Sequence, residues 1–109
     1  MPDIGETLQV RSRAAWRRWL QRHHATKSEI WLVLYKKHVN PSGFSHDDAT
    51  EEALCFGWID GILKRIDDKK HALRFSPRRP NSVWSDSNKC RVRRLIQSGQ
   101  MTEAGLEAV

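Results

Sequence analysis

The chain has 109 residues, the usual length of one domain. Hydrophobic residues make up 39% and charged residues 29% of it, a globular balance that excludes collagen-like, low-complexity and disordered chains. The formal net charge is +6, and the sequence has no apolar run of about 18 residues that could form a transmembrane helix.

The N-terminus and the cysteines indicate the compartment. The chain does not open with a basic stretch followed by an apolar run, so we predict no secretory signal and a cytoplasmic location. Cys55 and Cys90 lie far apart in apolar-periodic stretches, which predicts two buried free thiols. No Cys or His accompanies them at ligand spacing and the histidines are scattered, so neither a metal site nor a cofactor is predicted.

The first forty residues predict one helix and one strand. Residues 1–11 are expected to form a loose lead-in, and Ser12 to cap a helix over 13–24 that has one apolar stripe. The run over 29–37 is rich in β-branched and aromatic residues and is apolar on both faces. This pattern predicts a central, well-covered strand, followed by a turn at 40–43.

A capping-box pattern marks the next helix. Ser45 and Asp48 have the required spacing, and they predict a helix over 46–56 that Gly57 closes in a left-handed conformation. The carboxylates in its first turns are interpreted as a solvated face that complements the helix dipole; they are Asp47, Asp48, Glu51 and Glu52.

The second half predicts a hairpin and two further helices. Alternating strands over 58–66 and 71–76 should pair antiparallel. A stiff, proline-bounded basic loop follows, and then a helix over 86–98 and another from 103 onward. This order predicts an α+β fold, with a small three-stranded, mainly antiparallel sheet flanked by about four helices.

Residues 1–109 therefore form a single predicted domain, preceded only by the short lead-in. The last predicted helix is still short where the sequence stops. We therefore expect the natural chain to continue beyond Val109.

Several short motifs resemble a known family. They are ALCFGWIDG at 53–61, FSPRRP at 75–80 and the WS pair at 84–85. With them, residues 10–109 resemble the YdeI/OmpD-associated family, also called the OmdA domain, whose members are labelled bacteriocin-protection proteins. The resemblance implies a role in stress or antimicrobial-peptide protection, and it implies no established reaction or cofactor.

One candidate site lies on the first strand of the hairpin. Strand alternation places Trp58, Asp60 and Lys64 on one side, where an aromatic ring, a carboxylate and an ammonium would form the floor of a pocket. The alternative is a core tryptophan beside a solvent-facing pair of charges.

A second candidate site is the loop that leads into the helix at 86–98. Arginines next to a helix N-terminus form a natural anion cradle; the residues are Arg78, Arg79, Ser82, Trp84, Ser85 and Asn88. The alternative is plain capping by Ser85 with an exposed Asn88. We predict that Asp60 or Asp67 holds Arg78, and that Arg78 lines a concave surface with Trp58 and Trp84.

Residues 1–60 have no net charge, so the whole surplus of +6 lies in residues 61–109 and favours an anionic partner. We predict a non-catalytic binding module for an anionic or aromatic small molecule or a partner protein, with no catalytic residue. One alternative is nucleic-acid binding through the basic half, including Arg91, Arg93 and Arg94. The other is an enzyme that uses Asp60 or Asp67 with Arg78.

Overall fold

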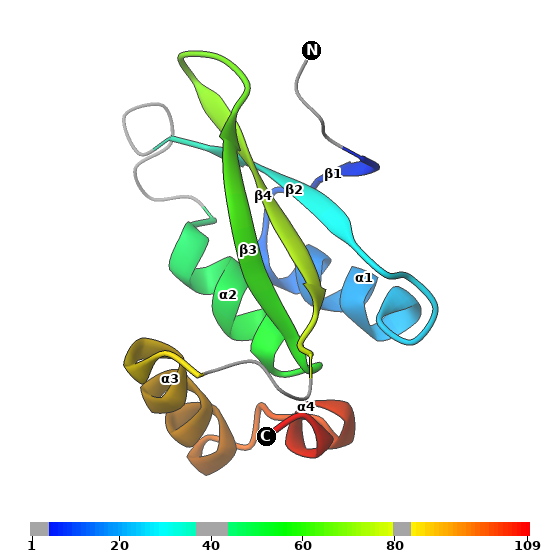
Figure 1. Ribbon diagram of the computed structural model, residues 1–109, viewed down its shortest axis with the longest axis vertical. Helices are drawn as coiled ribbons and strands as arrows, with labels where there is room; N and C mark the ends of the chain where they lie inside the picture. The colour runs from blue at the N-terminus through cyan, green and yellow to red at the C-terminus, as the bar shows by residue number, and fades with distance from the viewer. Residues whose placement is uncertain (1–4, 37–43, 80–83) are drawn as a thin grey trace.

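A computed structural model describes residues 5–36, 44–79 and 84–109. It has the α+β fold that the sequence predicts (Figure 1). In chain order its elements are β1 (Thr7–Gln9), α1 (Arg13–His23), β2 (Ile30–Tyr35), α2 (His46–Leu54), β3 (Trp58–Arg65), β4 (Lys70–Pro77), α3 (Asp86–Gln97) and α4 (Glu103–Glu107). In the described part of the chain, no helix combines the length and apolarity that crossing a bilayer requires.

The sheet has four strands in the order β1-β2-β4-β3. The predicted antiparallel hairpin is confirmed as β3 and β4, and β2 is internal, as predicted. The expectation of a loose lead-in is wrong for residues 7–9, because β1 pairs parallel with β2 and makes the sheet mixed. A strand of three residues is too short to show a periodicity, and its pairing with β2 and the packing of Leu8 against the core stabilise it.

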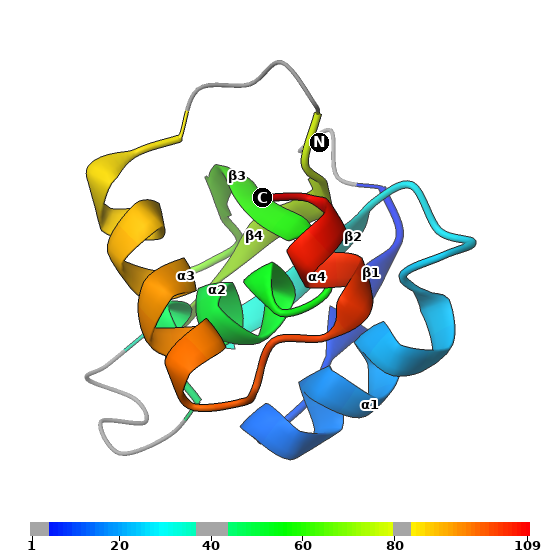
Figure 2. The same cartoon turned by 90° about the horizontal axis from the view of Figure 1, so that it is seen from below.

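The core lies between one face of the sheet and helices α1 and α2. Ile30, Leu32, Leu73 and Phe75 line that face and are fully or almost fully buried. Trp16 of α1 packs on Phe75 with 5.2 Å between ring centroids, and its indole N–H donates to the Ala49 carbonyl of α2 at 2.9 Å. Figure 2 shows α2 lying between α1 and α3.

A β-bulge in β3 reverses the face of the sheet on which each side chain after it lies. Asp60 pairs with Phe75, but Leu63 rather than Ile62 pairs with Leu73, so one extra residue is inserted between them. Lys64 then pairs with Ala72 and lies on the face opposite Asp60. The prediction that Lys64 shares a side with Trp58 and Asp60 is therefore wrong.

The end of α2, the end of β4 and α4 meet at one end of the molecule. Gly57 has a φ of 77°, the left-handed conformation predicted for it, and its carbonyl accepts the Arg78 N–H at 2.9 Å. The Thr102 N–H donates to the Cys55 carbonyl at 3.0 Å, and the Thr102 hydroxyl donates to the same oxygen. Gly105 packs so closely on Cys55 that a Cβ would overlap the carbonyl. These contacts fix α4 against the mouth of the hairpin.

The two cysteines differ. Both thiols are free, as predicted, but only Cys55 is buried, and Cys90 is exposed on α3. The prediction of two buried thiols is wrong for Cys90, because the buried stripe of α3 runs through Asn88, Val92 and Leu95.

Candidate functional site

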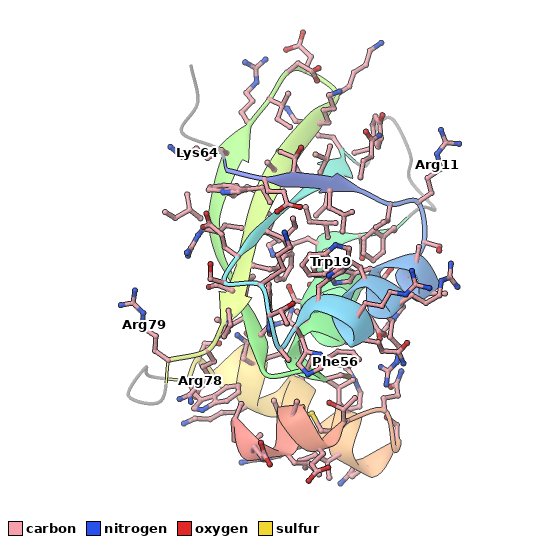
Figure 3. All side chains as sticks on the ribbon, turned by 90° about the vertical axis from the view of Figure 1, so that its right-hand side faces the viewer. Arg11, Trp19, Phe56, Lys64, Arg78 and Arg79 are labelled. Carbon is pink, nitrogen blue, oxygen red and sulfur yellow. The ribbon has the colours of Figure 1, made fainter. Side chains whose placement is uncertain are left out.

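A hollow of about 600 Å³ opens where the hairpin mouth meets α4. Its lining comes from the end of α1, the turn after α2, the hairpin, the start of α3 and α4, and includes His24, Phe56, Trp58, Arg78, Trp84 and Glu107. Figure 3 shows Arg78 and Phe56 near this end of the molecule, and Lys64 at the other end. We call it the Arg78 hollow.

Arg78 is held in a defined orientation at the edge of this hollow. Its guanidinium carbon lies 4.3 Å from the centroid of the Trp84 ring, which is cation–π geometry. Its Nη1 donates to the Ala108 carbonyl at 3.1 Å. The Trp84 ring and the Ala108 carbonyl therefore hold the guanidinium in the lining of the hollow.

Neither expected carboxylate holds Arg78, although both lie in the described part of the chain. Asp60 Oδ2 lies 3.4 Å from His46 Nε2 instead. Asp67 lies at the opposite end of the hairpin, where it accepts the Lys69 and Lys70 N–H groups at 2.8 and 3.0 Å. The prediction that Asp60 or Asp67 holds Arg78 is wrong, and the guanidinium instead contacts the Trp84 ring and the Ala108 carbonyl.

Trp58 forms the floor of the Arg78 hollow and is also a core residue. It is 1% exposed, and its indole N–H donates to the His24 carbonyl at 3.2 Å. This agrees with the core-tryptophan alternative, although the ring still contributes to the lining.

Asp60 and Asn88 form a separate cluster. The hydrogen bond with His46 lowers the pKa of Asp60, against the opposing effect of burial, and a hydrogen bond with Asn88 lowers it further. Asn88 is 7% exposed, contrary to the exposed position in the capping alternative, and its Oδ1 accepts from Arg91 at 3.0 Å. The cluster ties the N-termini of α2 and α3 to β3.

Those of the other predicted site residues that the structure describes do not line the Arg78 hollow. Ser85 caps α3 by accepting the Asn88 N–H at 3.1 Å. Arg79 is exposed and points away from the molecule in Figure 3. Lys64 lies on the opposite face of the sheet, and Ser82 lies outside the described residues.

A family model described as a domain of unknown function, DUF8412, matches residues 8–108. The chain belongs to the DUF8412 family. Neither the curated proteins nor the solved structures contain a match.

This assignment corrects the resemblance to the YdeI/OmpD-associated family. The motifs at 53–61 and 75–80 are short, whereas the DUF8412 model matches nearly the whole chain. The stress and bacteriocin-protection role that the resemblance implied therefore has no support.

The DUF8412 domain also has hollow-lining residues that sequence reasoning missed, namely His24, Phe56 and Glu107. They come from three different helices or helix ends, and only tertiary packing brings them together. The sequence indicated the position of Phe56 only in part. Gly57 was predicted to end a helix in a left-handed conformation directly before a strand, and such a turn places Phe56 at a corner of the fold.

Proposed function

We propose that this DUF8412 domain is a non-catalytic binding module that takes an anionic or aromatic ligand, or such a group of a partner protein, in the Arg78 hollow. The observation that carries the proposal is the Arg78 guanidinium stacked on Trp84 at the edge of a hollow of about 600 Å³. Pockets that enclose small ligands measure about 300–1,000 Å³.

The chemistry of the hollow supports this class of ligand. Stacking on Trp84 and bonding to Ala108 restrict the arginine, so less side-chain entropy is lost when it binds an anion. The half-buried Trp84 offers aromatic surface beside that charge, and Phe56, which is only 5% exposed, adds an apolar part of the lining. Tryptophan and arginine are the residue types in which binding energy concentrates.

The surroundings of Asp60 favour binding over catalysis. A general acid or base that works near neutral pH needs a carboxyl pKa raised toward that range. The pKa of Asp60 is lowered instead, by His46, and the Asp60 carboxylate forms no ion pair with Arg78. A cytoplasmic location remains a prediction from the sequence.

The test is a small-molecule screen by NMR that follows the Trp84 indole resonance. It covers aryl carboxylates, aryl phosphates and their neutral analogues. We expect anionic aromatic compounds to shift Trp84, Gly57 and Ala108 at millimolar concentrations or below. Shifts scattered away from these residues would contradict the proposal.

A matched pair of variants distinguishes binding in the Arg78 hollow from nonspecific attraction to the positive charge of the protein. Arg78→Ala should weaken the binding of a hit about tenfold or more, because it removes a charge-assisted contact. Arg79→Ala removes the same charge one residue along, on a side chain that points away, and should leave the affinity within about twofold. Equal effects of both substitutions would show that only net charge matters.

A further inference from the structure

The outer side of α3 carries a second hollow, of about 330 Å³. We call it the α3 groove, and its lining residues are Trp84, Lys89, Val92, Arg93, Ile96 and Val109. Positions 89, 92, 93 and 96 follow the i, i+3, i+4, i+7 spacing of one helix face. One side of a single helix therefore supplies most of this lining.

The floor of the α3 groove is apolar. Val92 is 5% exposed and belongs to the core, so it closes the bottom. Ile96 is 45% exposed, although it is a large aliphatic residue on a charged helix. Trp84 is half-buried and also packs against the core. Covering Ile96 and the exposed part of Trp84 would remove apolar surface from water, which favours an apolar occupant.

Two cations that flank this floor have no carboxylate partner among the residues that the structure describes. Lys89 and Arg93 are exposed, and in the described part of the chain no carboxylate lies within ion-pair distance of either. By contrast, Arg91 of the same helix pairs with Asp47 at 2.8 Å, and Arg94 pairs with Glu51. The described carboxylates therefore do not neutralise the positive charge of Lys89 and Arg93 at the α3 groove.

The size of the α3 groove decides between a protein and a small molecule. A stable protein interface buries about 800 Å² on each partner. Among the described residues, the exposed large apolar ones beside this groove are Ile96 and Val109, whereas a volume of about 330 Å³ lies within the range for small ligands.

We propose that the α3 groove binds a free small organic anion with an apolar body. The apolar body lies on Val92, Ile96 and the edge of Trp84, and the anionic group lies between Lys89 and Arg93. This site is distinct from the Arg78 hollow, although Trp84 and Val109 line both.

The test compares two fluorescent probes that differ in one group. 1-Anilinonaphthalene-8-sulfonate has an apolar aromatic body and one anionic group, and N-phenyl-1-naphthylamine has the same body without it. We expect the folded chain to bind the sulfonate with a saturable rise in fluorescence and the neutral probe at least fivefold more weakly. We also expect the preference to shrink as salt is raised, because exposed charges are screened.

Two double variants test whether the sulfonate binds at the α3 groove. Lys89→Gln/Arg93→Gln should weaken sulfonate binding about five- to tenfold and leave binding of the neutral probe within twofold. Glutamine is a good helix former, so both exposed substitutions should leave α3 intact, which circular dichroism checks. The control is Arg65→Gln/Lys69→Gln, which removes the same two charge types at the far end of the hairpin and should leave both affinities unchanged.

The outcomes for the two hollows can be told apart. The sulfonate is itself an anionic aromatic compound of the class expected in the Arg78 hollow, so both probes are also measured on Arg78→Ala and on Arg78→Ala combined with Lys89→Gln/Arg93→Gln. Sulfonate binding that persists in Arg78→Ala within about twofold and is lost in the combined variant belongs to the α3 groove, and failure of the Arg78 hollow then does not imply failure of this site. The α3 proposal is overturned if Lys89→Gln/Arg93→Gln binds the sulfonate as well as the unaltered chain does. It is also overturned if both probes bind equally, or if the control double variant loses as much affinity.

Discussion

The two sides of α3 show how differently the same residue types behave in one helix. On the inner side, Arg91 and Arg94 pair with Asp47 and Glu51 of α2. On the outer side, Lys89 and Arg93 flank an apolar groove. The inner pairs join residues far apart in sequence, so an arginine from the basic half is neutralised by a carboxylate from the other half. A surplus of charge along the sequence therefore does not translate into one continuous basic face.

The ion pairs on the inner side of α3 belong to a network that extends across α2 to α1. Arg13 donates to Glu52 at 2.6 Å and to Glu51 at 2.8 Å, and Arg17 donates to Glu52 at 2.8 Å. The side chain of Glu52 is only 3% exposed. The carboxylates of α2 thus join three helices, and the interpretation of a solvated acidic face is wrong for Glu52.

This network weakens the nucleic-acid alternative in one respect. That alternative relied on Arg91, Arg93 and Arg94 as phosphate-binding groups. Two of these three arginines already have carboxylate partners, so binding a phosphate with them would require breaking those pairs.

The largest expected effect comes from removing the partners of Glu52. The variant Arg13→Ala/Arg17→Ala leaves a buried carboxylate without its cations, and we expect it to lose about 3 kcal/mol of unfolding free energy. Urea denaturation monitored by tryptophan fluorescence measures this. The triple variant that also carries Glu52→Gln should recover a substantial part of the loss, because it removes the buried charge. If the double variant were as stable as the original chain, the inner network would contribute no more than surface charges do.

Sequence reasoning placed most elements because their signals are local. Ser12, Ser45 and Ser85 each cap a helix in the structure, and Gly57 and Gly99 have the positive φ angles that close helices. A serine cap or a closing glycine acts through the backbone within one turn, so its position in the sequence is enough to predict it.

The candidate site was only partly predictable because its geometry depends on distant contacts. The return of the hairpin past Gly57 follows from antiparallel pairing, and it correctly placed Arg78 near Trp58. A bulge of one residue moved Lys64 to the other face, and His46 rather than Arg78 became the partner of Asp60. Both outcomes depend on register and on tertiary packing, which residue types and spacing leave open.

A smaller effect on the unfolding free energy should distinguish the inner side of α3 from its outer side. Arg91→Gln/Arg94→Gln breaks two ion pairs, and we expect a loss of about 1 kcal/mol. Lys89→Gln/Arg93→Gln breaks none of the described ion pairs and should change the unfolding free energy by less than about 0.5 kcal/mol. Thermal unfolding of both variants at low and high salt measures the difference, and only the first pair of substitutions should reduce the dependence on salt. An equal loss in both variants would remove the distinction between the sides.

The smallest expected effect is a dependence of stability on acid pH that comes from Asp60, whose cluster with Asn88 adjoins the inner side of α3 through Arg91. His46 lowers the pKa of Asp60 below its usual value of about 4. A carboxyl whose folded-state pKa is lowered stabilises the fold above its unfolded-state pKa, and this contribution is lost as the pH falls through the folded-state pKa. The difference in unfolding free energy between the original chain and Asp60→Asn should therefore be largest at about pH 5 and shrink toward pH 2.5. Urea denaturation over that range measures it.

His46→Gln should move the titration of the Asp60 carboxyl carbon in NMR toward higher pH, because it removes the contact that contributes most to the lowered pKa. If the stability difference between the original chain and Asp60→Asn stayed constant with pH, the carboxylate would have no special role in joining β3 to the ends of α2 and α3.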